Sequence, residues 1–163
     1  MASIYWVQSA AFQTTAAPVV VATGTAIKTL IQIGIPSTQR IKVVEWGISF
    51  DTPGSAGTVK CELVQTDVAA TTGTSITPQP YEDANDPASA CAGGAALTCF
   101  QPSAEGSTTV VRVGDLQLIT PPYIYVKQWP LGREFGAPVS KFLRVRVTAS
   151  VTCNAYAYVI WEE

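Results

Sequence analysis

The segment KFLRVRVTASVTCNAYAYVIWEE, residues 141–163, decides the fold class. In its first half, Leu143, Val145 and Val147 alternate with two arginines, and its second half alternates small or apolar residues with tyrosines. Successive side chains of a β-strand point to opposite faces, so this period of two indicates strands with one buried face. The segment therefore predicts a β-hairpin. Its second strand gathers one apolar set on a single face: Cys153, Ala155, Ala157, Val159 and Trp161.

Seven other segments share the β-branched and aromatic composition of this pair, which brings the expected strands to about nine. They are residues 4–8, 17–23, 26–35, 40–50, 57–65, 108–119 and 123–129. Turn-forming runs such as PSTQ, DTPGSAG and PLGREFGAP separate them. Only TPQPYEDANDPASAC, residues 77–91, has helix-starting residues, with room for one or two short turns. The pattern predicts an all-β protein, an antiparallel β-sandwich or jelly roll of about eight to nine strands.

The domain organisation is expected to be simple. A chain of 163 residues forms one domain, residues 1–163, with a substantial core. Residues 1–25 are rich in Ala and Thr, and we expect either an N-terminal arm that orders against a partner or an ordinary edge strand. Residues 66–107 lack periodicity and predict one long excursion from the sandwich. Loops of that length in a compact domain are usually functional or contact a partner.

The low charge of the chain limits its partners. Charged residues make up 13% and apolar residues 47% of the sequence, so the share of charge is about half the usual one. Such a surface suits a protein that packs against others. The net charge of −2 and the lack of a basic patch argue against a nucleic-acid partner. No run approaches the roughly 20 apolar residues that cross a bilayer, and no signal peptide is evident, so no membrane partner is expected.

Histidine is absent, which removes the commonest general base and the commonest neutral metal ligand. The acidic cluster of Glu82, Asp83 and Asp86 lacks the spacing of a calcium loop. Glu45 and Asp51 border a strand segment with no second catalytic motif beside them. We therefore expect no enzymatic activity, no cofactor and no metal site.

The four cysteines fall into two pairs. Cys61 and Cys153 lie on the apolar faces of strand segments, and we expect them to be buried in the core. Cys91 and Cys99 flank the loop CAGGAALTC, where a local disulfide and two free thiols are both open. Their spacing does not fit the short knuckles of zinc sites.

Aromatic residues offer a carbohydrate-binding alternative, because four Trp and six Tyr could form a sugar-stacking surface. We expect Trp46 and Trp161 to be core residues, and Trp6 and Trp129 to lie near strand ends. The turn WPLGREFG, with Trp129, Arg133 and Glu134, predicts either a contact loop or a solvated turn.

Five stretches covering nearly the whole chain carry a family resemblance: RIKVVEWGISFD, GTVKCELVQTDV, EDANDPASAC, AEGSTTVVRVGDLQLITPP and SKFLRVRVTASVTCNAYAYVIWEE. Together they resemble small all-β proteins encoded by tailed bacteriophages and prophages, especially of actinobacteria. The resemblance implies a non-enzymatic virion protein, such as a capsid decoration protein made in the host cytoplasm and bound to the outside of the shell. It also implies a homo-oligomer, specifically a trimer, with the major capsid protein or other virion proteins as partners. A tail, tube or filament subunit and a lectin-like module remain alternatives.

Overall fold

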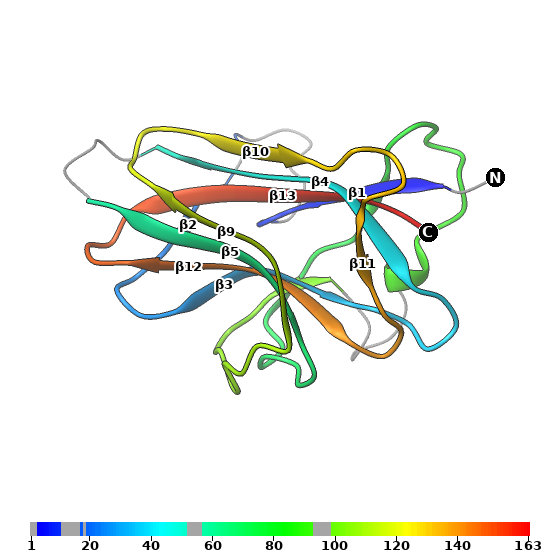
Figure 1. Ribbon diagram of the computed structural model, residues 1–163, viewed down its shortest axis with the longest axis horizontal. Coiled ribbons are helices and arrows are strands. Elements are labelled where there is room, and N and C mark those ends of the chain that lie inside the picture. The colour runs from blue at the N-terminus through cyan, green and yellow to red at the C-terminus, as the bar shows by residue number, and fades with distance from the viewer. Residues whose placement is uncertain (1–2, 11–16, 18, 52–56, 93–98) are drawn as a thin grey trace.

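Two antiparallel β-sheets pack face to face in this protein (Figure 1). The structure is a computed structural model and describes residues 3–10, 17, 19–51, 57–92 and 99–163. Within these residues the only helical element is a 3₁₀ turn, η2, at Ala90–Ala92. The all-β sandwich expected from the sequence is confirmed.

Sheet A has seven strands, and its two longest strands lie side by side at its centre. The order is β10 (Tyr125–Gln128), β4 (Ile41–Phe50), β13 (Asn154–Glu162), β1 (Ile4–Gln8) and β7 (Gln79–Pro80). Two short strands pair outside this path: β11 (Phe135–Ala137) with β4, and β2 (Val21–Ala22) with β13.

Sheet B has six strands and forms the other layer of the sandwich. Its order is β6 (Thr74–Ser75), β8 (Phe100–Gln101), β3 (Lys28–Gly34), β12 (Phe142–Ala149), β5 (Val59–Thr66) and β9 (Arg112–Ile119). The edge strand β9 pairs with β5 on one side, and no strand of the described residues pairs with its other side.

The expected hairpin of residues 141–163 is wrong, although both of its strands exist. β12 lies in sheet B between β3 and β5, whereas β13 lies in sheet A between β4 and β1. The short connection between them carries the chain from one sheet to the other. The period of two fixes which face of a strand is apolar but not which strand it pairs with. Both apolar faces meet the same core, from opposite layers.

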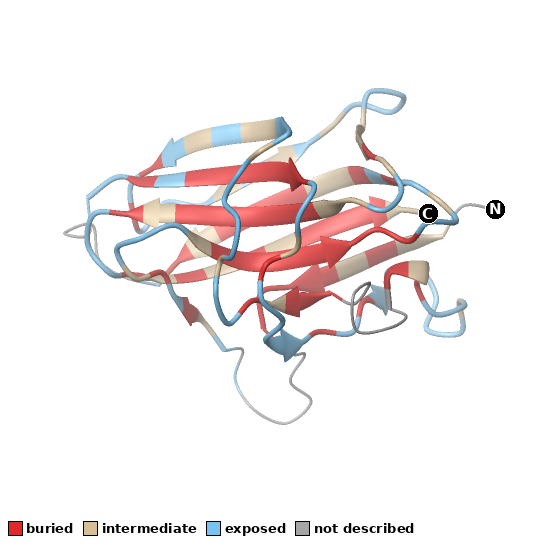
Figure 2. Ribbon diagram, turned by 90° about the horizontal axis from the view of Figure 1, so that it is seen from below, coloured by how far each residue is buried: buried red, intermediate tan, exposed pale blue. Residues whose placement is uncertain are grey.

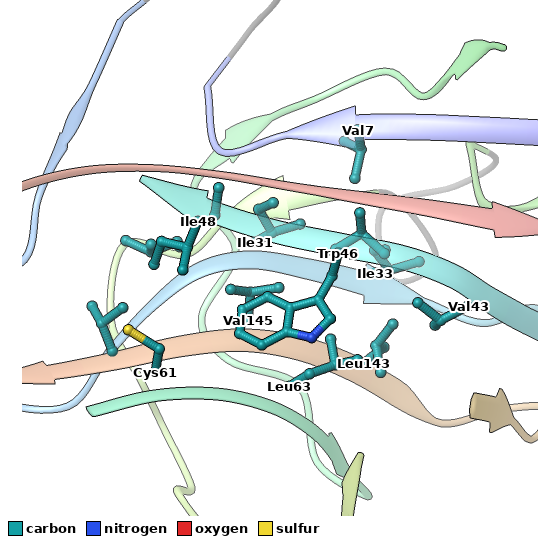
Figure 3. Packing of buried hydrophobic residues seen from close by; sticks show 14 of the residues in the cluster. Val7, Ile31, Ile33, Val43, Trp46, Ile48, Cys61, Leu63, Leu143 and Val145 are labelled. Atoms are coloured by element: carbon teal, nitrogen blue, oxygen red, sulfur yellow. The ribbon is translucent and has the colours of Figure 1, made fainter. Parts of the chain in front are cut away.

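The core fills the space between the sheets, where the inward residues of both layers interdigitate. Trp46 on β4 reaches across this space toward Leu63 on β5 and Leu143 and Val145 on β12 (Figure 3). The apolar set predicted for β13 is buried without exception, from Cys153 at 2% exposure to Trp161 at 0%. Figure 2 shows the same arrangement as buried central strands bordered by exposed turns.

The N-terminal segment contains one inner strand, β1, and one short strand, β2, that pairs with β13 alone. β1 pairs with β13 along its whole length and with β7 on its other side. Val7 is fully buried in the core. The alternation of apolar residues in IYWVQ suits an inner strand, and an unusually short neighbour, β7, covers its outer edge. The parts of the predicted arm at residues 1–2, 11–16 and 18 lie outside the described residues.

The excursion of residues 66–107 folds back onto the sandwich and contributes to both sheets. β6 and β8 extend sheet B, whereas β7 extends sheet A. Before the first of these strands, Ala70 N–H donates to Gln32 Oε1 at 2.8 Å. The described parts of the excursion therefore extend both sheets, and they cover part of the outer face of sheet B.

Two arginines of β12 are buried beneath this cover. The guanidinium of Arg144 donates to the carbonyl oxygens of Val68, Glu105 and Ser107, and that of Arg146 donates to Thr108 O. These arginines are 0% and 4% exposed, although the alternation places them on the face away from the core. Hydrogen bonds to backbone carbonyls replace the water that an outward face would otherwise contact.

Candidate interaction surfaces

The four cysteines are free thiols, and all are buried. Cys61 and Cys153 belong to the core cluster and lie close enough for the charge of one to affect the other. Burial, with smaller contributions from Cys153 and Glu62, raises the pKa of Cys61 to about 12. A buried thiol with a raised pKa, such as that of Cys61, is a poor nucleophile and a poor metal ligand, and both cysteines belong to the core cluster.

Cys91 and Cys99 also lie close together, at the edge of the core near Glu163. Of the two alternatives from the sequence, the structure has free thiols. Burial is the main cause that raises the pKa of each thiol, and the neighbouring Glu163 carboxylate adds to it. Glu163 accepts hydrogen bonds from Ser89 Oγ and from Ala90 N–H at 2.8 Å, which ties the η2 turn to the end of β13.

The predicted contact loop forms a compact turn. Trp129 is half-buried and stacks on Phe135, with ring centroids 6.4 Å apart. Glu134 Oε1 accepts from Gly132 N–H at 2.7 Å, and backbone bonds of this kind lower the pKa of Glu134. Arg133 is exposed, and Leu131 at the tip is 95% exposed.

A pocket of about 530 Å³ lies beside this turn. Trp129 and Glu134 line it and Arg133 does not, so the structure brings only two of the three predicted residues into one site. Its wall is mostly apolar, with Val44, Leu131 and Ile4 among the lining residues.

A second pocket, on the outer face of sheet A, gathers aromatic side chains from separate parts of the chain. This aromatic pocket has a volume of about 330 Å³ and is lined by Trp6, Glu45, Tyr81, Tyr156, Tyr158 and Ile160. The sequence pattern alone did not predict this pocket. The sequence feature that points to this pocket is the alternation of tyrosines with small residues in β13, which places Tyr156 and Tyr158 on the outward face of the strand. Finding it required knowing that β13 lies between β4 and β1.

Hydrogen bonds fix the two β13 tyrosines within this pocket. Tyr158 OH donates to Glu45 Oε1 at 2.5 Å, and Tyr156 OH donates to Gln8 Oε1 at 2.6 Å. Burial, followed by the bond to Glu45, raises the pKa of Tyr158. Each hydroxyl is therefore held as a protonated donor to an oxygen on a neighbouring strand.

The third surface is the side of the sandwich where β9 and β10 end the two sheets. Half of the fourteen large hydrophobic residues that are exposed in the described structure fall within residues 111–126. We call this set the apolar edge: Val111, Val113, Leu116, Leu118, Tyr123, Ile124 and Val126. The two strands are the edges of different sheets.

Asp115 closes the sandwich along this side. Its Oδ2 accepts from Trp46 Nε1 at 3.1 Å and from Tyr125 OH at 2.8 Å, which links β9 to sheet A. Its Oδ1 accepts from Leu116 N–H and Gln117 Nε2, both at 3.0 Å. Burial and the bond to Asp115 raise the pKa of Tyr125 to about 12. With both oxygens occupied by donors, this carboxylate is placed to fasten the layers rather than to transfer protons.

No group of three or more His, Cys, Asp or Glu side chains in the described ranges is placed to hold a metal ion. Nor does that part of the chain contain a helix long and apolar enough to cross a membrane.

Comparison with known proteins adds no further constraint. The sequence matches no family model, and neither the curated proteins nor the solved structures contain a match to this chain.

Proposed function

We propose that this chain is a non-enzymatic structural protein of a bacteriophage virion, a decoration protein that binds the outside of the capsid as a homo-oligomer. The resemblance of five stretches of its sequence to small phage proteins motivates the proposal. The observation that carries it furthest is the apolar edge along β9, because that surface suits assembly and not catalysis.

β9 has only part of the usual protection of an edge strand. Natural sheets keep edges short, place Lys or Pro on them, or cover them, because free N–H and C=O groups recruit other strands. β9 is eight residues long, contains neither Lys nor Pro, and exposes Leu118 at 69% and Val113 at 54%. Its protective features are a bulge at Gly114, where Leu63 faces Asp115 and Val64 faces Val113, the charged Arg112 at its start, and the inward-pointing Asp115. Such an edge is expected to be covered in the working state of the protein.

A second copy of the chain is the partner that best fits β9. An antiparallel ladder of β9 with β9 would place the two Arg112 side chains at opposite ends, so like charges would not meet. Asp115 is already bonded within its own subunit. The exposed leucines of the two copies would then lie near each other on one face of a continuous sheet.

The number of chains in the oligomer depends on which strand edge of a neighbouring chain pairs with β9. Pairing β9 with β9 gives a two-fold dimer, whereas the trimer implied by the resemblance requires β9 to meet a different edge of the next copy. A contact between different edges that does not close would give a filament, as in a tail or tube subunit. Light scattering of the purified protein separates these arrangements. A strictly monomeric protein at micromolar concentration would contradict self-association.

The location on the shell is tested with virions. Purified protein is added to capsids that lack it, and bound protein is located by electron cryo-microscopy. We expect density on the outer surface at symmetry-related positions of the shell. Density confined to the tail would favour the tail alternative, and no association with any virion component would overturn the proposal.

A further inference from the structure

The aromatic pocket on the outer face of sheet A has a flat ring at its floor. Tyr158 faces Gly47 across the β13–β4 ladder. A Cβ atom on Gly47 would lie 2.4 Å from Tyr158 Cε1 and 2.7 Å from Cζ, so the tyrosine ring lies directly over the glycine. Only glycine permits this close approach, because any other side chain would occupy the space of the ring. One face of the ring is thus turned to the sheet and the other away from it.

Polar groups of Glu45 and Tyr156 lie beside this ring in the same pocket. Glu45 Oε1 holds the Tyr158 hydroxyl, whereas Glu45 Oε2 accepts no hydrogen bond from any described residue. The Tyr156 hydroxyl is oriented by Gln8. Tyr81, which follows β7, is 57% exposed and forms part of the rim. The site therefore combines aromatic faces with a carboxylate oxygen that can accept from a ligand hydroxyl.

We propose that this pocket binds a neutral carbohydrate, with a pyranose ring stacked on Tyr158 and Tyr81 and a sugar hydroxyl donating to Glu45. The C–H groups on one face of a pyranose are weakly positive and match the negative face of an aromatic ring. Hydroxyl groups on its rim are donors to a carboxylate, and hydrogen bonds to a charged acceptor are the stronger kind. The Glu45 charge repels sialic and uronic acids, so the specificity is for uncharged sugars.

The size of the pocket favours a short contact. At about 330 Å³ it lies at the lower end of ligand-binding pockets, which span roughly 300–1,000 Å³. It accommodates one or two sugar rings and leaves the rest of a glycan in solvent. The strand proposed to pair in assembly and the strands that line this pocket are different: assembly uses β9 in sheet B, whereas the aromatic pocket is lined by residues of β13, β4, β1 and the end of β7. The β10 side of the apolar edge lies closer, because Ile124 and Val126 line a neighbouring hollow with Tyr156 and Tyr158.

The test measures binding of chitotriose, cellotriose, maltotriose and sialyllactose by saturation-transfer NMR and calorimetry. Tyr81→Ala is the principal variant, since its side chain is 57% exposed and its loss leaves the core intact. Tyr123→Ala is the matched control, because Tyr123 is 71% exposed and lies on the apolar edge. We expect at least one neutral trisaccharide to bind, with affinity about tenfold lower in Tyr81→Ala and unchanged in Tyr123→Ala.

Glu45→Gln tests the carboxylate separately from the rings. We expect weaker binding of the neutral trisaccharide, because the amide loses the charged acceptor that a sugar hydroxyl requires. Absence of binding by all three neutral probes would overturn the proposal, as would binding that Tyr81→Ala leaves unchanged. Preferential binding of sialyllactose would overturn the assignment of an uncharged ligand. None of these outcomes bears on self-association through β9, which is measured independently by light scattering.

Discussion

Arg144 carries its charge in a site with no exposed surface, on the face of β12 that points away from the core. Three backbone carbonyls of the excursion accept from its terminal nitrogens, and the Glu105 carboxylate lies 3.9 Å away. Glu105 in turn accepts from the backbone N–H and the hydroxyl of Thr29. Burial lowers the pKa of Arg144, and Glu105 opposes this effect. The single side chain thereby joins β12, β3 and both ends of the excursion.

Replacing Arg144 with Ala is expected to lower the free energy of unfolding by about 3–5 kcal/mol, because it leaves Glu105 and three carbonyls without their buried partner. Urea denaturation followed by tryptophan fluorescence measures the change. Arg133→Ala is the control, since Arg133 is exposed on a turn and its loss should cost under about 0.5 kcal/mol. Similar stability of the two variants would show that the excursion is not fastened through Arg144.

The cysteines predict a simple thiol count. The four are buried free thiols, so the native protein should not react with an aromatic disulfide reagent such as DTNB. After denaturation without reductant, all four should react. Two reactive thiols per chain in the denatured protein would instead reveal a Cys91–Cys99 disulfide.

Cys61 also makes stability depend on alkaline pH. Its pKa is about 12 in the folded protein and 9.0 when unperturbed. Between these values the unfolded chain has lost the thiol proton and the folded chain retains it, so the contribution of Cys61 to the free energy of unfolding is constant below pH 9 and falls as pH rises toward 12. The slope contributed by one thiol is at most about 1.4 kcal/mol per pH unit. Cys61→Ala should show a shallower decline in denaturation curves, and equal slopes would contradict this origin.

Strands with strong period-two patterns could be predicted from the sequence, whereas the short strands could not. Residues 4–8 match β1, and 40–50 and 154–161 match β4 and β13 within one residue at each end. β6, β7 and β8 have two residues each, too few to show a period, and β11 has three. Pairing was also beyond the pattern, as the separation of β12 and β13 into different sheets shows. The aromatic pocket depends on that pairing and was missed for the same reason.

The free side of β9 predicts the effect of one charge on assembly. Leu118→Lys places a cation on the edge, across the ladder from Lys60, and lysine on an edge opposes pairing with another strand. We expect the variant to be folded and monomeric where the wild type is oligomeric, as measured by light scattering and circular dichroism. Leu131→Lys makes the same substitution at a 95% exposed turn and should leave the oligomer intact. Dissociation by both variants would point to net charge instead of the edge.

Across the whole molecule, the two ends of the chain meet within sheet A. Ile4 faces Glu162 in the ladder of β1 with β13, and Glu163 N–H donates to Ser3 O at 3.0 Å. Because the two ends lie side by side, they can be joined by a linker, and the chain can be opened instead at an exposed turn without cutting a strand.

A circular permutant that joins residue 163 to residue 3 through a short linker and opens between Gly132 and Arg133 is therefore expected to fold. Its far-UV circular dichroism should match the wild type, and its thermal unfolding should stay cooperative. A permutant opened between Val145 and Arg146 is the contrasting variant, since it cuts a central strand of sheet B. If the permutant opened at the turn failed to fold while the permutant opened within β12 folded, an uncut β12 would not be what the fold requires.

The position of β13 also sets the order in which a ribosome can complete the fold. β13 is synthesised after every other described strand, yet it occupies the centre of sheet A, between β4 and β1. Until it emerges, those two strands have no common neighbour, and the nascent chain exposes two open edges of the kind that recruit other polypeptides. The centre of sheet A is thus completed only after translation reaches Glu162. Prematurely terminated products therefore lack the strand that joins β4 to β1, and chaperones that shield unpaired strands should associate with this chain during its synthesis.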